Sequence, residues 1–117
     1  MGRRGERAAA GHLRRKRYRL LRRNYRCPAG EIDLICSDQN TIVFVEVKTR
    51  TDERAAELSE ALRPPQRQRM EHAAKYFLAE RRIHDRPCRF DVVTVLWPPR
   101  GAPRIEHFED AFQARRG

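Results

Sequence analysis

Two short apolar segments, residues 31–36 and 42–50, constrain the fold most strongly, because each combines acidic residues with β-branched or aromatic ones. Side chains of a strand alternate between its two faces. In the second segment, Glu46 and Lys48 therefore continue an apolar row that includes Phe44, while three valines form the other face. A polar cluster with turn-forming residues separates the segments. The pattern predicts two antiparallel strands joined as a hairpin.

The distribution of acidic side chains predicts the register of this hairpin. If side chains alternate regularly along the first strand, one face carries Glu31, Asp33 and Ile35, and the other carries Ile32, Leu34 and Cys36. A four-residue loop over residues 38–41 gives the pairs Ile35 with Phe44, Asp33 with Glu46, and Glu31 with Lys48. A slip of one residue would place the acidic face of one strand opposite the valine face of the other, so the pattern favours this register.

Asp33 and Glu46 are thus expected to face each other. Like charges repel at the ~4.5–5.5 Å between opposed Cβ atoms, so a positive group is required between them. Lys48 is one candidate and a divalent cation is another, since paired carboxylates are ligands that Mg²⁺ takes. The alternative is a buried ion-pair network around Lys48 that only stabilises the hairpin. The residues alone leave both interpretations open.

The rest of the chain predicts an α/β fold with a central mixed sheet, in one domain over residues 1–117. The expected elements are a helix over residues 4–17, strands over 18–25 and 88–97, a loop or weak helix over 51–63, a helix over 64–82, and a short edge strand over 104–107 before a terminal turn that holds Phe108, Ala111 and Phe112. Glu6 shares a helical stripe with Leu13, so its carboxylate is expected to point toward the sheet. It is either a third ligand or a first-turn acid that complements the helix dipole.

Net charge is confined to one end of the chain. The sequence has 26 basic and 16 acidic residues, and residues 1–26 alone contain eleven basic side chains against the single acid Glu6. A local basic surface of this kind neutralises phosphates, which favours nucleic acid as the partner over a merely solvated surface. The segment lacks the apolar face of a membrane-surface helix. Because no apolar run is long enough for a membrane span or signal peptide, a cytoplasmic protein without a membrane partner is expected.

Four blocks of the sequence carry a family resemblance: G-E at residues 5–6, G-E-I-D-L-I at 30–35, V-F-V-E-V-K at 43–48 and R-F-D-V-V at 89–93. On these blocks the chain resembles the YraN family of small bacterial proteins. That family in turn resembles the PD-(D/E)-x-K nucleases, particularly archaeal Holliday-junction resolvases. The resemblance implies an α-β-β-β-α-β core of the restriction-endonuclease type.

The resemblance also implies roles for individual residues. Asp33 and Glu46 would bind Mg²⁺ (or Mn²⁺), Glu6 would complete the metal shell, and Lys48 would orient or activate water. Gln66 occupies the place at the start of the second long helix where family members commonly have lysine. Gln66 is therefore a further candidate for the site, and Glu31, the residue expected to face Lys48, is another.

Together these observations predict a metal-dependent endonuclease that acts on DNA. The expected substrates are branched structures that arise in repair or recombination. No recognition helix, zinc finger or base-stacking motif is found, so sequence-specific cutting is not expected. The candidates for phosphate contacts are Arg14, Arg15, Arg22, Arg23, Arg26 and Arg50. The alternative is a non-catalytic nucleic-acid-binding module with a vestigial nuclease site. The sequence leaves open whether the nucleic acid is DNA or RNA, whether one or two metal ions bind, and whether the protein forms a homodimer.

Overall fold

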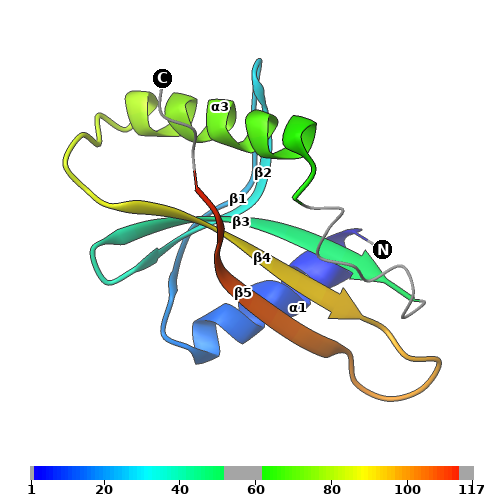
Figure 1. The fold of residues 1–117 in the computed structure, drawn as a ribbon. Helices are drawn as coiled ribbons and strands as arrows, with labels where there is room; N and C mark the ends of the chain where they lie inside the picture. The colour runs from blue at the N-terminus through cyan, green and yellow to red at the C-terminus, as the bar shows by residue number, and fades with distance from the viewer. Residues whose placement is uncertain (1, 52–61, 114–117) are drawn as a thin grey trace.

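The computed structural model describes residues 2–51 and 62–113. The elements are α1 (Gly2–Arg15), β1 (Arg19–Cys27), β2 (Gly30–Asp38), β3 (Thr41–Arg50), α3 (Pro64–Glu80), β4 (Cys88–Leu96) and β5 (Arg104–Phe112). The five strands form one sheet in the order of the sequence, in which β3 and β4 are parallel and the other neighbours are antiparallel. The predicted mixed sheet with an antiparallel meander is therefore confirmed (Figure 1).

Helices α1 and α3 lie on opposite sides of the sheet (Figure 1). Helix α1 buries Ala9, Ala10 and Leu13 on the valine face of β3, while its arginines stay exposed. It ends where Arg17 adopts a φ of +71°, a left-handed conformation that a helix cannot continue. Helix α3 covers the other face, and its predicted apolar stripe is buried at Met70, Ala73, Ala74 and Phe77.

The predicted hairpin register is confirmed where the two strands pair. Ile35 lies opposite Phe44, and the pairing continues to Asp38 opposite Thr41, which leaves Gln39 and Asn40 as the turn. Ile35 and Phe44 are both fully buried under α3. The acidic and apolar pattern of the sequence is therefore sufficient to set this part of the sheet.

The expectation of a four-residue loop over residues 38–41 is wrong, because Asp38 and Thr41 pair and only Gln39 and Asn40 form the turn.

The expectation of simple alternation along β2 is also wrong. Ile32 belongs to the core under α3, whereas Leu34, two residues further on, belongs to the core under α1. The faces exchange at Asp33. The pairing with β1 joins Arg23 to Leu34 and then Tyr25 to Ile32, so Asn24 lies between these pairs, and its φ of +48° interrupts the regular strand. The β1–β2 ribbon bends at this point, and its tip rises beside α3 (Figure 1).

The prediction of a terminal turn after residue 107 is also wrong. Strand β5 continues to Phe112, where the Phe112 ring stacks on that of Phe90 with centroids 4.8 Å apart. Pairing with β4 along this length stabilises an edge strand whose own pattern is weak. The loop or weak helix expected over residues 51–63 falls largely on residues 52–61, which lie outside the described ranges.

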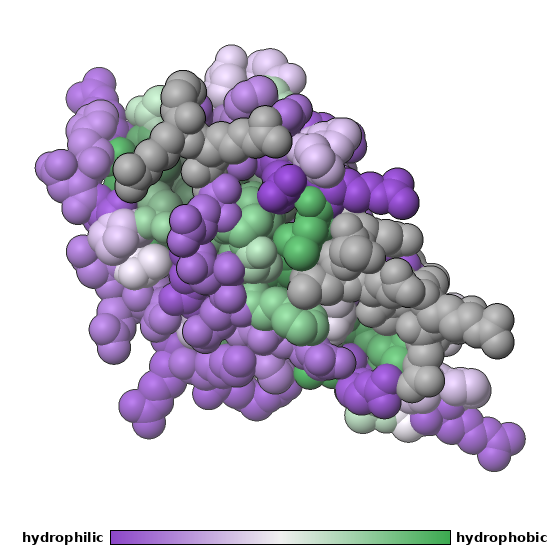
Figure 2. Space-filling model, in the orientation of Figure 1, coloured by the Kyte–Doolittle hydropathy of each residue, from purple (hydrophilic) through white to green (hydrophobic). Residues whose placement is uncertain are grey.

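Figure 2 shows hydrophilic residues over most of the face seen in Figure 1, with apolar residues gathered mainly in its centre. Among the large apolar side chains of the described residues, Tyr76 is the exposed exception. No helix in these residues is long and apolar enough to cross a membrane. The exposed surface is therefore dominated by the charged side chains that make up 36% of the chain.

Candidate active site

The candidate site forms where strands β2 and β3 stop pairing. The regular ladder ends at Leu34 and Val45. One residue beyond it, Asp33 Oδ2 accepts a hydrogen bond from the backbone N–H of Val47 at 2.7 Å. The carboxylate thus replaces a strand carbonyl as the acceptor, and the expected direct backbone pair of Asp33 with Glu46 does not form. Both side chains nevertheless lie where β2 and β3 separate, which we call the split, and they are close enough to interact electrostatically.

Glu46 is held by groups from two elements. Its side chain lies on the α3 side of β3 and the residue is 8% exposed. Glu46 Oε1 lies 3.4 Å from Lys48 Nζ and accepts a hydrogen bond from Gln66 Nε2 at 3.1 Å. Lys48 reaches this oxygen because residues two apart in a strand share a face, and Gln66 reaches it from the first turn of α3. The structure therefore brings together Glu46, Lys48 and Gln66 beside Asp33.

Both carboxyl groups have raised pKa values, with burial as the largest cause. The pKa of Asp33 is raised to about 7, first by burial and then by the nearby charge of Glu46, against the opposing hydrogen bond from Val47. Burial also raises the pKa of Glu46, although Lys48 and Gln66 favour its charged form. Two negative charges are thus disfavoured at this position unless a cation joins them. This electrostatic arrangement suits a divalent metal ion.

Helix α1 approaches the split from the other side of the sheet. A Cβ on Gly5 would lie 1.9 Å from Thr49 Oγ1, so only glycine permits this close contact with the end of β3. The next residue, Glu6, is half-buried, and its charge contributes to the raised pKa of Asp33. Within residues 2–51 and 62–113, however, no three Asp, Glu, His or Cys side chains converge as a group that could hold a metal ion. Glu6 is near the pair without completing a three-residue ligand set.

The structure does not bring the remaining predicted residues to the carboxylates. Glu31 is exposed and pairs with Arg26 at 3.4 Å, so the expected contact between Glu31 and Lys48 is absent from the described ion pairs. The other arginines are distributed as follows: Arg14 and Arg15 are exposed at the end of α1, Arg22 lies 5.3 Å from the Tyr25 ring centroid, Arg23 borders a hollow with Glu6, and Arg50 donates to the carbonyl of Thr49. Of the predicted phosphate contacts, Arg23 is the one that shares a hollow with Glu6.

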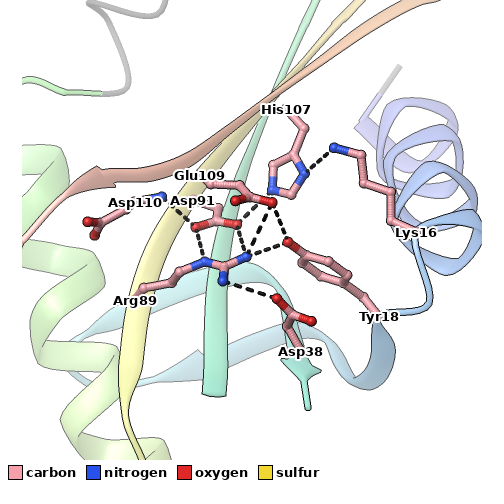
Figure 3. Close-up of polar contacts among 8 residues, drawn as sticks. All are labelled: Lys16, Tyr18, Asp38, Arg89, Asp91, His107, Glu109 and Asp110. Carbon is pink, nitrogen blue, oxygen red and sulfur yellow. Dashed lines mark hydrogen bonds and ion pairs between the residues drawn. The ribbon is translucent and has the colours of Figure 1, made fainter. Parts of the chain in front are cut away.

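A second polar cluster, which the sequence analysis did not predict, lies on the α1 side of the sheet (Figure 3). The guanidinium of Arg89 is its centre. Arg89 donates to Asp91 at 3.0 Å and to Asp38 at 3.2 Å, and it also contacts Tyr18 and Glu109. These residues come from β4, β2, the segment after α1, and β5. The Arg89 cluster thus ties the sheet to the end of α1.

Asp91 is the most deeply buried charge in the Arg89 cluster, with 0% exposure. Burial alone would raise its pKa, but hydrogen bonds from His107, Arg89 and the Asp110 N–H outweigh burial and lower the pKa. Since the carboxylate can only accept, His107 Nε2 donates to it at 2.6 Å, and His107 Nδ1 then accepts from Lys16 Nζ at 3.0 Å. A charged residue inside the apolar segment F-D-V-V-T-V is the signal that could have revealed this position, as it did for Glu46.

Comparison with known proteins decides the family. The model of the uncharacterised protein family UPF0102 matches residues 5–95, more than three quarters of the chain. The chain belongs to the UPF0102 family. The resemblance to the YraN family is thereby confirmed, because the two are the same family. The match spans Glu6, Asp33, Glu46, Lys48 and Gln66, so every candidate for the site lies within the family domain.

Individual UPF0102 proteins are similar over nearly the whole chain. One from Geotalea uraniireducens is 41% identical over 113 residues, which cover 97% of this chain and 89% of the relative. One from Pelotomaculum thermopropionicum is 42% identical over 113 residues, covering 96% and 94%. One from Moorella thermoacetica is 45% identical over 91 residues, covering 78% and 76%. These lengths show that UPF0102 proteins are of similar size to this chain.

Proposed function

We propose that this UPF0102 protein is a Mg²⁺-dependent endonuclease that cleaves phosphodiester bonds of DNA in the cytoplasm. The observation that carries the proposal is the placement of Asp33 and Glu46 at a split between two strands, with the Lys48 ammonium 3.4 Å from a Glu46 oxygen. Two carboxylates and an adjacent lysine are the groups that phosphodiester hydrolysis uses to bind metal and to position water. The resemblance to PD-(D/E)-x-K nucleases supports the same chemistry.

The residues present suit a hard divalent cation. Asp33 and Glu46 supply carboxylate oxygens, which Mg²⁺ and Mn²⁺ prefer, and both are destabilised as a pair of anions in the absence of a cation. They would hold the ion, with Glu6 as the proposed third acid. When bound, the ion would supply Lewis acidity toward the phosphate and would acidify water.

The protein's own groups account for positioning. Lys48 would place a positive charge beside the attacked phosphate and hydrogen-bond to the attacking water, since an ammonium has three donors. Gln66 would keep the Glu46 carboxylate oriented from α3, because its amide already donates to Oε1. The Val47 N–H fixes Asp33 in the same way. The site is therefore preorganised by one hydrogen bond to each carboxylate from outside the pair.

DNA structure, more than DNA sequence, is the proposed basis of selection. The arginines at residues 14–26 are exposed or bordering the split, and guanidinium contacts to phosphates carry no sequence information. Helices α1 and α3 each pack one side on the sheet. Neither helix can therefore insert that side into a groove of DNA. Branched or flapped DNA of the kind found in repair or recombination is the substrate class that we propose.

One observation favours a second candidate, a nucleic-acid-binding module without catalysis. Both carboxylates have protein partners, namely Val47 for Asp33 and Lys48 and Gln66 for Glu46. Within the part of the chain that the structure describes, no third ligand converges on them. A vestigial site of this kind would stabilise the hairpin and would not respond to metal.

Metal binding distinguishes the two candidates. Adding Mg²⁺ or Mn²⁺ at about one hundred times its Kd should stabilise the wild-type protein by about 2.7 kcal/mol. At roughly 4 °C per kcal/mol for a domain of this size, the expected rise in Tm is about 10 °C. The Asp33→Asn variant should melt at least as high as wild type without metal, because the repulsion is removed, and should lose the metal-induced rise. Thermal melts followed by circular dichroism measure both.

The matched control is Asp85→Asn, which removes one exposed carboxylate from the loop before β4 and should leave the rise unchanged. A metal-induced rise that persists in full in Asp33→Asn would place the metal elsewhere. The absence of any rise in the wild-type protein would support the non-catalytic module.

A further inference from the structure

A basic hollow lies at the start of α3, next to the candidate site. It has a volume of about 340 Å³ and is lined by Lys48, Arg63, Pro65, Gln66 and Arg69. Three of these five side chains are cationic, and none of the described residues that line the hollow is acidic. Neither Arg63 nor Arg69 was predicted to have a role from the sequence. We refer to these five residues as the α3 hollow.

The α3 hollow is linked to the buried carboxylate of the candidate site through its lining residues. Two of its lining residues, Lys48 and Gln66, approach the same oxygen of Glu46. A group bound in the hollow would therefore contact residues that also position Glu46. This shared wall makes the hollow adjacent to the reacting centre and not a separate surface feature.

Two cations of the α3 hollow, Arg63 and Arg69, face solvent. Both residues are exposed, and neither side chain forms a hydrogen bond or ion pair with another described residue. Arg26 and Arg89, by contrast, are paired with acids. The first turn of α3 contains no acid, so the positive end of the helix dipole adds to the guanidinium charges. Such an arrangement favours an anion with several oxygens.

A second basic hollow lies on the α1 side of the carboxylates. It has a volume of about 300 Å³ and includes Arg3, Arg7 and Arg23 beside Glu6. Asn24 also lines this hollow, and the pairs formed by its neighbours, Arg23 with Leu34 and Tyr25 with Ile32, flank Asp33. This hollow is therefore near Asp33, as the α3 hollow is near Glu46. In a nucleic-acid strand, the cleaved phosphate has a neighbouring phosphate on each side. Basic hollows on both sides of the carboxylates could each contact one of these neighbours.

We propose that the α3 hollow binds the backbone phosphate that neighbours the cleaved phosphate, with Arg63 and Arg69 as its contacts. This inference rests on the proposed function. It defines a path for one nucleic-acid strand, from Arg3, Arg7 and Arg23 past Asp33 and Glu46 to the start of α3. The substrate class is thereby an internal phosphodiester of a continuous strand, not a terminal nucleotide.

The test measures binding of a fluorescein-labelled single-stranded DNA by anisotropy in EDTA, over a series of salt concentrations. The variant Arg63→Ala/Arg69→Ala removes both proposed contacts. Each phosphate contact contributes about 0.7 to the slope of log K against log salt for a single strand, so the slope should fall by about 1.4 and the affinity by at least about tenfold. In Mg²⁺, the loss in cleavage should appear mainly in KM, because the carboxylates and Lys48 are intact.

The matched control is Lys75→Ala/Arg100→Ala, which removes the same charge from two exposed positions away from the hollow. The control should bind as wild type, and both variants should melt within a few degrees of wild type. If the wild-type protein binds DNA and the Arg63→Ala/Arg69→Ala variant matches it in slope and affinity, the inference is wrong while the proposed function stands. If the wild-type protein does not bind DNA at all, both are overturned.

Discussion

Replacing Lys48 with arginine will leave the protein folded and able to bind DNA, yet it will lower metal-dependent cleavage by about 100-fold or more, the scale of losing one well-placed catalytic group. Arginine keeps the positive charge and pairs well with a carboxylate, so the ion pair with Glu46 survives. Its forked guanidinium is larger than an ammonium and is always protonated. The guanidinium therefore should not replace the Lys48 ammonium, which lies 3.4 Å from Glu46 Oε1, in the proposed role of positioning water.

Initial cleavage rates in Mg²⁺, with DNA anisotropy and thermal melts on the same preparations, check this expectation. Lys75→Arg is the matched control, because Lys75 is exposed in the middle of α3 and should tolerate the same exchange. Wild-type cleavage rates in Lys48→Arg would remove Lys48 from the mechanism. If Lys48→Arg loses much stability and the wild-type protein does not cleave DNA, Lys48 only neutralises Glu46.

Replacing Asp91 with alanine will have the largest effect on stability. Asp91 is completely buried and accepts from Arg89, His107 and the backbone of Asp110. Its removal leaves the Arg89 guanidinium facing a cavity with only its contacts to Asp38, Tyr18 and Glu109. Breaking a buried ion pair on one side costs about 3–5 kcal/mol, so Tm should fall by about 12–20 °C at roughly 4 °C per kcal/mol.

Urea unfolding followed by circular dichroism measures this loss as a free energy. The control Asp85→Ala removes an exposed aspartate and should change the free energy of unfolding by less than about 0.5 kcal/mol. Asp91→Asn should fall between the two, because it retains an acceptor and loses the charge. A loss below about 1 kcal/mol in Asp91→Ala would show that the Arg89 cluster does not stabilise the contact between α1 and the sheet.

Local pattern was sufficient to predict the centre of the sheet. The pair of Ile35 with Phe44 follows from alternation in each strand, and the common face of Glu46 and Lys48 follows from their spacing of two. Pattern along one strand could not predict the exchange of faces at Asp33. That exchange depends on the left-handed backbone of Asn24 in the neighbouring strand. The interaction is between strands, so the sequence of β2 alone carries no sign of it.

Long-range contacts explain the other differences. The hydrogen bond from Gln66 to Glu46 depends on how α3 crosses the sheet, and only the family resemblance had pointed to Gln66. Strand β5 lacks clear alternation, yet it extends to Phe112 because His107 bonds to Asp91 and Phe112 stacks on Phe90. The basic hollow at Arg63 and Arg69 likewise forms only when α3 meets the end of β3.

Cleavage of a panel of branched, flapped and fully duplex DNAs in Mg²⁺ tests the central claim most directly, with EDTA and Asp33→Asn as the two controls. The account predicts metal-dependent internal cuts by the wild-type protein, faster on branched or flapped DNA than on duplex. EDTA should abolish cleavage, and Asp33→Asn should reduce it by about 100-fold or more. No cleavage of any member of the panel by a protein that binds both Mg²⁺ and DNA, or equal cleavage by Asp33→Asn, would contradict it.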